Sequence, residues 1–184
     1  MNEEIIIAGF GGQGVLSMGK ILAYSGIMGG KEVSWMPSYG PEMRGGTSNV
    51  TVIISDDKIS SPALATFDNA IILNQQSLDK FETMVKPGGV LIYDPNGITR
   101  HPVRKDISIY QIAATDKASE IGIAKLFNMI VLGGFLKIKP IINEEFIQKG
   151  LEKSLPKRHH GMIPENVKAV TVGMEIIKAI QVLK

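Results

Sequence analysis

Short apolar runs alternate with amphipathic stretches along the first half of the chain. Residues 4–8 form an isoleucine-rich run that ends at glycine, which is typical of a buried strand. Residues 13–28 carry apolar side chains at helical spacing and end at Gly29-Gly30, so they predict a helix with a glycine C-cap. Similar short runs bounded by turn residues predict further strands at residues 32–36, 50–55, 69–73, 90–93 and 107–112.

Helical patterns dominate the second half of the chain. Further helices are expected at residues 77–85, within residues 115–138 as one or two helices, from Asn143 onward, and at residues 165–183. The strand–helix alternation predicts a three-layer α/β/α fold, with a largely parallel, Rossmann-like sheet and a helical C-terminal part. Because no repeat or linker interrupts the pattern, residues 1–184 are expected to form a single domain.

The composition narrows the class of protein. The chain has 184 residues, of which 44% are hydrophobic and 21% charged, a balance typical of a globular protein. The net charge is only +2 and no basic stripe lies among aromatic residues, so no nucleic-acid partner is expected. The acidic N-terminus does not resemble a signal peptide, and no apolar stretch approaches the roughly 20 residues of a membrane span. We therefore expect a cytoplasmic protein without membrane contact.

The sequence contains no cysteine, which excludes disulfides, thiolate zinc sites and cysteine-ligated iron–sulfur clusters on this chain. His159 and His160 are adjacent and would point apart in an extended segment, so residues 157–160 are expected to form a solvated loop. Residues 94–97 are a turn by composition, although their place after a predicted strand leaves a crevice role as the alternative. We predict no metal site and no catalytic acid, base or nucleophile.

A glycine-rich segment between the first strand and the first helix is the most informative local pattern. Gly9-Phe10-Gly11-Gly12-Gln13-Gly14 fits G-x-G-x-x-G in the strand–turn–helix context that gives this motif its meaning. Glycines allow a tight turn, and the helix N-terminus offers N–H groups to an anion. The alternative is that the glycines only let the strand turn into the helix.

A nicotinamide-dinucleotide site would also need an acid at the end of the second strand, about 20 residues further on. That region reads Ser34-Trp35-Met36-Pro37, and Glu32 lies at the other end of the strand. A phosphate is therefore expected at the glycine-rich turn, whereas the use of NAD is disfavoured.

A second loop, residues 38–48, follows the second predicted strand and should lie beside the glycine-rich turn, since loops at the carboxyl ends of strands surround the ligand crevice. Arg44 is its candidate ligand-binding residue, because a planar guanidinium suits a phosphate or carboxylate. The alternative is that Arg44 pairs with Glu42 or a carbonyl and only stiffens the loop.

The sequence resembles a known family, the gamma subunits of 2-oxoacid:ferredoxin oxidoreductases. The resemblance rests on the glycine-rich segment and on the unusual string Ser-Tyr-Gly-Pro-Glu-Met-Arg-Gly-Gly-Thr-Ser at residues 38–48. It continues through Ile54-Ser55-Asp56 and Ser61-Pro62, and it returns at Lys86-Pro87-Gly88-Gly89 and Ile163-Pro164-Glu165-Asn166. The likeness thus covers almost the whole chain.

The resemblance implies that the chain belongs to a complex that oxidatively decarboxylates a 2-oxoacid, forms an acyl-coenzyme A and reduces ferredoxin. It implies that 2-oxoglutarate or a branched-chain 2-oxoacid is favoured over pyruvate. Thiamine diphosphate and iron–sulfur clusters would reside on the alpha, beta and delta subunits, and ferredoxin would be met only indirectly. Isolated from these partners, the chain could form a homodimer.

The resemblance also implies two sets of site residues. The residues expected to contact the phosphates of coenzyme A are Gly9, Phe10, Gly11, Gly12, Gln13 and Gly14, with Arg44 as a further candidate. The residues expected to face a partner subunit are Ser38, Tyr39, Gly40, Pro41, Glu42, Met43, Gly45 and Gly46. A stand-alone nucleotide-binding or regulatory module that senses an anion remains the alternative, since such a turn does not by itself imply turnover.

Overall fold

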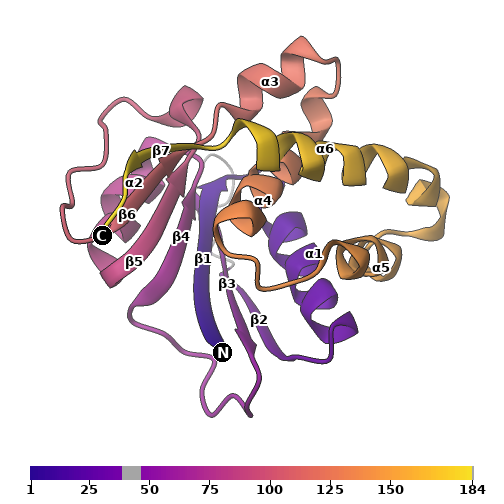
Figure 1. Cartoon of the computed structure of the whole chain (residues 1–184), viewed down its shortest axis with the longest axis horizontal. Helices are drawn as coiled ribbons and strands as arrows, with labels where there is room; N and C mark the ends of the chain where they lie inside the picture. The colour runs from indigo at the N-terminus through magenta and orange to yellow at the C-terminus, as the bar shows by residue number, and fades with distance from the viewer. Residues whose placement is uncertain (39–46, 184) are drawn as a thin grey trace.

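Seven strands form one mixed sheet in the computed structural model, which describes residues 1–38 and 47–183 (Figure 1). The strand order across the sheet is β2-β3-β1-β4-β5-β6-β7. The strands are β1 (Asn2–Phe10), β2 (Glu32–Ser38), β3 (Thr47–Ser55), β4 (Phe67–Ile72), β5 (Val85–Tyr93), β6 (Ser108–Gln111) and β7 (Lys178–Gln181).

Most strands of this sheet run in one direction. The pairs β1–β4, β4–β5 and β5–β6 are parallel, whereas β1–β3, β2–β3 and β6–β7 are antiparallel. It follows that β1, β2, β4, β5 and β6 point one way, and that β3 and β7 point the other way. The expected α/β fold with a largely parallel sheet is confirmed, with two reversed strands that the sequence pattern did not predict.

Helices cover both faces of the sheet. One face carries α1 (Val15–Met28), α3 (Ala114–Glu120), α4 (Phe127–Ile138), α5 (Glu144–Ser154) and α6 (Ile163–Ile176), and the other carries the shorter α2 (Gln75–Phe81). Successive side chains of β1 point to opposite faces of the sheet. Ile5 and Ile7 pack under the first group of helices, and Ile6 packs under α2. Because both faces are covered, the strand is apolar at consecutive positions.

Glycines bring α4 and α6 into backbone contact. A Cβ atom built on Gly173 would lie 1.8 Å from the carbonyl oxygen of Ile130, and one on Gly133 would lie 1.9 Å from that of Val170. Neither position can hold a side chain unless the two helices move apart. This contact fixes α4, whose first turn reaches the glycine-rich segment.

The end of the chain differs from its sequence prediction. The last helix was expected over residues 165–183, but α6 ends at Ile176 and the chain continues as β7, antiparallel to β6. Ile177 has extended dihedrals, φ −63° and ψ 135°, which stop the helix. Tertiary pairing with the free edge of β6 therefore prevails over the local helical preference.

Smaller corrections concern three other segments. Residues 115–138 form two helices, separated by Gly122 at φ +75° and a 3-10 turn (Ala124–Leu126). Residues 157–160, expected as a loop, belong to the 3-10 helix Lys157–Met162. Pro37 lies inside β2 rather than after it, which is tolerated because β2 is an edge strand. Within the described residues, no helix has the length and hydrophobicity needed to cross a membrane.

Candidate functional site

The glycine-rich segment connects β1 to α1 at the carboxyl edge of the parallel strands. Its backbone closes a turn in which the Gln13 N–H donates to the Phe10 carbonyl at 3.2 Å. Gly12 and Gly14 both have left-handed dihedrals, with φ of +92° and +71°, and Gly14 is the N-cap of α1. Glycine is the residue that adopts this conformation without strain, so the sequence pattern and the backbone agree.

Three of the four glycines in this segment, Gly9, Gly12 and Gly14, have different surroundings. A Cβ on Gly9 would meet the Gln13 side chain at 2.5 Å and Leu73 at 2.9 Å, so Gly9 permits close packing. A Cβ on Gly14 would lie 2.4 Å from Nδ2 of Asn128 on α4. At Gly12, by contrast, a Cβ would find no described atom within 4 Å. Against the described residues, the turn is therefore packed at both ends and open in the middle.

The Gln13 side chain lies inside the turn. Its Oε1 accepts a hydrogen bond of 2.6 Å from the Phe10 N–H, and its Nε2 donates one of 3.2 Å to the Leu73 carbonyl at the end of β4. The Phe10 N–H is thus already occupied in this structure. Among the predicted phosphate contacts, Phe10 and Gln13 shape the turn through their mutual hydrogen bond.

The N–H groups of Gly11 and Gly12 have no partner among residues 1–38 and 47–183. Both residues are exposed, and neither N–H has an acceptor among the described residues. The start of α1 has no side-chain cap and no acidic residue in its first turn. Helix N-termini are normally satisfied by such groups, and an anion would serve the same purpose at a helix start that no described side chain caps.

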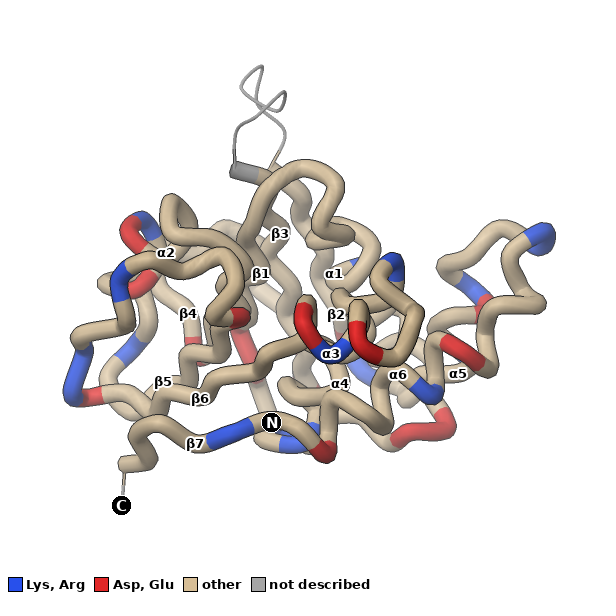
Figure 2. The backbone as a smooth tube through the Cα atoms, turned by 90° about the horizontal axis from the view of Figure 1, so that it is seen from above, with Lys and Arg blue, Asp and Glu red and all other residues tan. Residues whose placement is uncertain are grey.

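The described surroundings of the turn carry few charges. The chain has no Asp, Glu, Lys or Arg at residues 5–19, 47–55, 69–78 or 126–136. In Figure 2 the tube is tan where β1 passes into α1, and the charged residues gather around α2, α3, α5 and α6. A bound anion would therefore face the dipole of α1 without competition from a nearby carboxylate in these segments.

The turn lies at the switch point of the sheet. From β1 the chain crosses through α1 toward β2 on one side, while β4 lies on the other side of β1. Ligands of open α/β sheets bind outside the carboxyl ends of the strands at such a point. The hydrogen bond between Gln13 Nε2 and the Leu73 carbonyl spans it.

The neighbouring part of the crevice, beyond β4, is filled by the protein itself. Asn74 is buried at the N-cap of α2, where its Oδ1 accepts from the Ser77 N–H at 2.8 Å. Gly97 packs over this junction, since a Cβ there would lie 2.2 Å from the Leu73 carbonyl oxygen. Beyond β4, the described residues therefore pack closely against the carboxyl edge.

Asp94 is a buried carboxylate that directly follows β5, in the segment 94–97 predicted as a turn with a crevice role as the alternative. Its Oδ1 accepts from the Asn96 N–H at 3.0 Å, and its Oδ2 accepts from the N–H and hydroxyl of Thr115 at 2.9 and 2.7 Å. These bonds join the turn to the start of α3. The residue therefore connects β5 to α3, and its acceptor atoms are engaged within the protein.

Residues 94–107 form a long connection between β5 and β6 that is held against α2. The Gln75 Oε1 atom accepts hydrogen bonds from the N–H groups of Thr99 at 2.9 Å and Arg100 at 2.7 Å. We call this connection the strap. It was not predicted, because the polar residues that hold it are distant in sequence and follow no motif.

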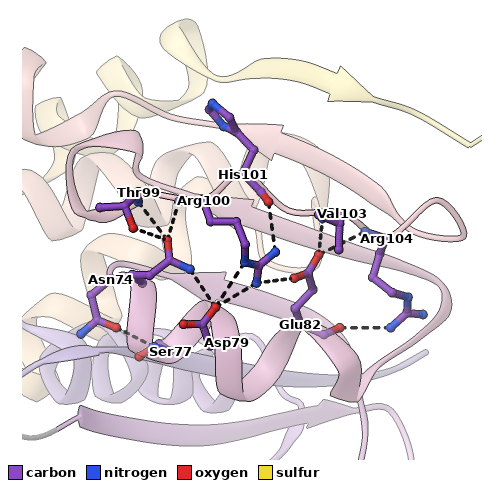
Figure 3. Close-up of polar contacts among 10 residues, drawn as sticks. Asn74, Ser77, Asp79, Glu82, Thr99, Arg100, His101, Val103 and Arg104 are labelled. Atoms are coloured by element: carbon purple, nitrogen blue, oxygen red, sulfur yellow. Dashed lines mark hydrogen bonds and ion pairs between the residues drawn. The ribbon is translucent and has the colours of Figure 1, made fainter.

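A buried carboxylate anchors the strap (Figure 3). Glu82 is only 3% exposed, pairs with Arg100 at 2.9 Å, and accepts from the N–H groups of Val103 at 2.5 Å and Arg104 at 3.1 Å. Arg100 also bonds Asp79 at 2.9 Å, which lowers the pKa of Asp79 and raises that of Arg100. The network holds the strap against α2 and the start of β5, where Arg104 also donates to the Val85 carbonyl at 3.1 Å.

The second predicted loop is described only at its flanks. Ser38 ends β2 and is exposed, and the register pairs Ser38 with Asn49 and Phe10 with Thr47. Both flanks thus lie at the same edge as the glycine-rich turn. The predictions for the ligand residue and partner-facing residues of this loop lie outside the described residues: Tyr39, Gly40, Pro41, Glu42, Met43, Arg44, Gly45 and Gly46.

The sheet order gives a second reason against a dinucleotide site. In the standard arrangement the second strand is adjacent to the first, so an acid at its end reaches the ribose. Here β3 lies between β1 and β2, and β2 ends at Met36-Pro37-Ser38 without an acid. The position of the expected carboxylate is therefore displaced by a full strand spacing, about 4.8 Å.

The histidine pair has local partners. The His159 Nε2 atom accepts from Arg158 at 3.1 Å, and the His160 Nε2 atom lies 3.1 Å from the Leu155 carbonyl. In the part of the chain that the structure describes, no three His, Asp or Glu side chains are grouped so as to hold a metal ion.

Comparison with known proteins adds independent information. The family model for pyruvate ferredoxin/flavodoxin oxidoreductase matches residues 4–176. The 2-oxoglutarate synthase subunit KorC of Methanocaldococcus jannaschii is 35% identical over 181 residues, which cover 97% of this chain and 95% of that protein.

Two solved structures are similar to the chain. The gamma subunit of the keto/oxoacid ferredoxin oxidoreductase of Geobacter sulfurreducens has a TM-score of 0.81 and 29% identity, and 96% of each chain is covered. The 2-oxoglutarate:ferredoxin oxidoreductase of Magnetococcus marinus, solved with 2-oxoglutarate, coenzyme A and succinyl-CoA bound, has a TM-score of 0.84 and 25% identity. That match covers 95% of this chain and 31% of the Magnetococcus chain.

Proposed function

The chain belongs to the pyruvate ferredoxin/flavodoxin oxidoreductase family as a gamma subunit, and we propose that its glycine-rich turn binds a phosphate group of coenzyme A. One observation carries the proposal: Gly11 and Gly12 are exposed and lie beside the N-terminus of α1, which no described side chain caps. Phosphate oxygens are strong acceptors, and such a helix start favours their negative charge.

We propose different roles for the residues of the predicted set. Gly11 and Gly12 present N–H groups to the phosphate, and Gly14 begins the helix whose dipole faces it. Gly9 allows the strand, Gln13 and Leu73 to pack together, while Phe10 and Gln13 close the turn. Support for coenzyme A as the ligand comes from the Magnetococcus relative, which was solved with coenzyme A bound.

The reaction is divided among several subunits in this proposal. The complex converts a 2-oxoacid and coenzyme A to an acyl-coenzyme A and carbon dioxide, and passes the electrons to ferredoxin. We place thiamine diphosphate and the iron–sulfur clusters on the alpha, beta and delta subunits, because this sequence has no cysteine for a cluster. The gamma chain contributes binding and orientation of coenzyme A, and we place the complex in the cytoplasm.

The loop of residues 38–46 is proposed to complete the site. Arg44 would pair with a second phosphate of coenzyme A, and the flanking residues would face a partner subunit. The strand ends that lead into this loop, Ser38 and Thr47, support the proposal because they lie at the edge that carries the glycine-rich turn.

A charge introduced at Gly12 tests the proposal in the assembled complex. We expect Gly12→Asp to raise the KM for coenzyme A by about tenfold or more, because a carboxylate would occupy the space for the phosphate. The KM for the 2-oxoacid should not change. The matched control is Gly30→Asp, since Gly30 has a similar positive φ of +75° and open surroundings but lies at the far end of α1.

The assay is acceptor reduction by the reconstituted complex with a panel of 2-oxoacids that includes 2-oxoglutarate and branched-chain acids. An unchanged KM for coenzyme A in Gly12→Asp would refute the phosphate site. Migration of the natively expressed chain as a small species without partners would favour the stand-alone anion-sensing module instead.

A further inference from the structure

Two neutral amide side chains hold the two ends of the glycine-rich turn. At its start, Gln13 accepts from the Phe10 N–H at 2.6 Å and donates to the Leu73 carbonyl at 3.2 Å. At its end, the Asn128 side chain from α4 donates through Nδ2 to the Gly14 carbonyl at 3.4 Å. The turn is thereby connected both to β4 and to α4.

Asn128 has hydrogen-bonding capacity left over. Its side chain is 8% exposed and lies directly over Gly14, where a Cβ would be 2.4 Å from Nδ2. Among the described residues, the bond to Gly14 is its one hydrogen bond, so Oδ1 and the second N–H of Nδ2 have no partner there. An amide can accept through its oxygen and donate through both N–H bonds, so these two groups are able to contact a molecule bound beside Gly14.

The packing of α4 against the rest of the fold fixes the position of Asn128. It lies in the first turn of α4, and α4 is held against α6 by the backbone contacts of Gly133 and Gly173. The Gln13 side chain is likewise restrained at both of its polar atoms. A site supported by restrained neighbours holds a ligand in one geometry.

We infer that Gln13 and Asn128 are positioning residues for the anion site, and that both must be uncharged. This inference rests on the proposed function, that is, on a phosphate of coenzyme A at the turn. Gln13 holds the turn so that the Gly11 and Gly12 N–H groups face outward, and Asn128 supplies a further N–H beside Gly14.

The chemistry of an anionic ligand explains why the Gln13 and Asn128 side chains carry no charge. Glutamate and aspartate have the same shape as Gln13 and Asn128, yet both positions hold the neutral amide, and residues 5–19 and 126–136 contain no charge at all. A carboxylate at either position would lose an N–H donor and would repel the phosphate in a partly buried setting, where charges interact more strongly than in water. The two amides thus support the turn without repelling an anionic ligand.

The test uses isosteric acids in the reconstituted complex. Gln13→Glu and Asn128→Asp should each raise the KM for coenzyme A by about tenfold or more, while kcat at saturating coenzyme A and the KM for the 2-oxoacid stay near the wild-type values. A merely structural role would lower kcat, both affinities and the melting temperature together. The matched control is Gln148→Glu on the exposed surface of α5, which should leave every constant unchanged.

Two neutral variants separate the effect of the added charge from the effect of losing the amide. Gln13→Met and Asn128→Ser keep the site uncharged, and each should raise the KM for coenzyme A less than its acidic counterpart does. If Gly12→Asp leaves the KM for coenzyme A unchanged, the phosphate site itself is wrong. If Gly12→Asp raises that KM but the two acidic variants do not exceed the neutral ones, the phosphate site stands and the role of Gln13 and Asn128 is overturned.

Discussion

The contact between α4 and α6 leads to a quantitative prediction for Gly173→Ala. A Cβ at this position would lie 1.8 Å from the Ile130 carbonyl oxygen, against an ordinary contact distance of about 3.5 Å. Since the obstructing atom belongs to the backbone, no side-chain rotation relieves the clash. The two helices would have to separate by more than about 1 Å, and the contacts of a closely packed interface would be lost.

Two opposing effects set the size of the change. Alanine is favoured over glycine in a helix by about 1 kcal/mol, which would stabilise the variant. Overpacking of a tight core costs about 1–3 kcal/mol, and a backbone clash belongs at the upper end of that range. We therefore expect a net loss of about 2 kcal/mol, equivalent to a decrease in melting temperature of about 4–8 °C for a chain of this size.

Thermal and urea unfolding of the purified chain, followed by circular dichroism, measure this change. Gly161→Ala is the control, because Gly161 has no atom within 4 Å of its would-be Cβ, and it should change stability by less than about 0.5 kcal/mol. Combining Gly173→Ala with Gly133→Ala should cost less than the sum of the two, since one separation of the helices accommodates both methyl groups. A Gly173→Ala variant as stable as the wild type, or more stable, would refute the reasoning.

Three further predictions concern carboxylates away from the turn. Glu82→Ala should cost about 1–3 kcal/mol and should speed amide hydrogen exchange within residues 98–106, because the strap loses its buried acceptor. Asp94→Asn should lower the free energy of unfolding in urea by a similar amount, since an NH2 group would replace one carboxylate oxygen and would face N–H or O–H donors. The hydrogen bond from Lys31 lowers the pKa of Asp56 from 3.8 to about 2. This stabilisation is present above pH 3.8 and is lost as the pH falls toward about 2, so the difference in unfolding free energy between wild type and Asp56→Asn should shrink over that interval and also with added salt.

The parts of the fold that follow local patterns could be predicted from the sequence. The first strand, the glycine-rich turn and α1 were identified because apolar spacing and glycine placement depend only on neighbouring residues. The insertion of β3 between β1 and β2 could not be predicted, since apolar strands look alike whichever neighbour they pair with. The replacement of a helix end by β7 has the same cause, because pairing with β6 is a tertiary effect.

The candidate site was predictable to a similar degree. The motif located the turn, but it could not show that the Gln13 side chain occupies the Phe10 N–H. Asn128 lies 114 residues away from Gly14 in sequence and belongs to no motif, so only the packing of α4 shows that it contacts the turn. Asp94 carried a weak signal, its place at the end of a strand, which indicated location and not its hydrogen-bond partners.

The antiparallel β3 also limits how this scaffold could be redesigned. In many α/β enzymes, a change of nucleotide preference needs one substitution at the tip of the second strand, because that tip lies next to the sugar. Here the equivalent tip is a whole strand further from the glycine-rich turn. An engineer who wanted this protein to accept a pyridine dinucleotide would have to rebuild the strand order, and random point mutagenesis should fail to reach that specificity.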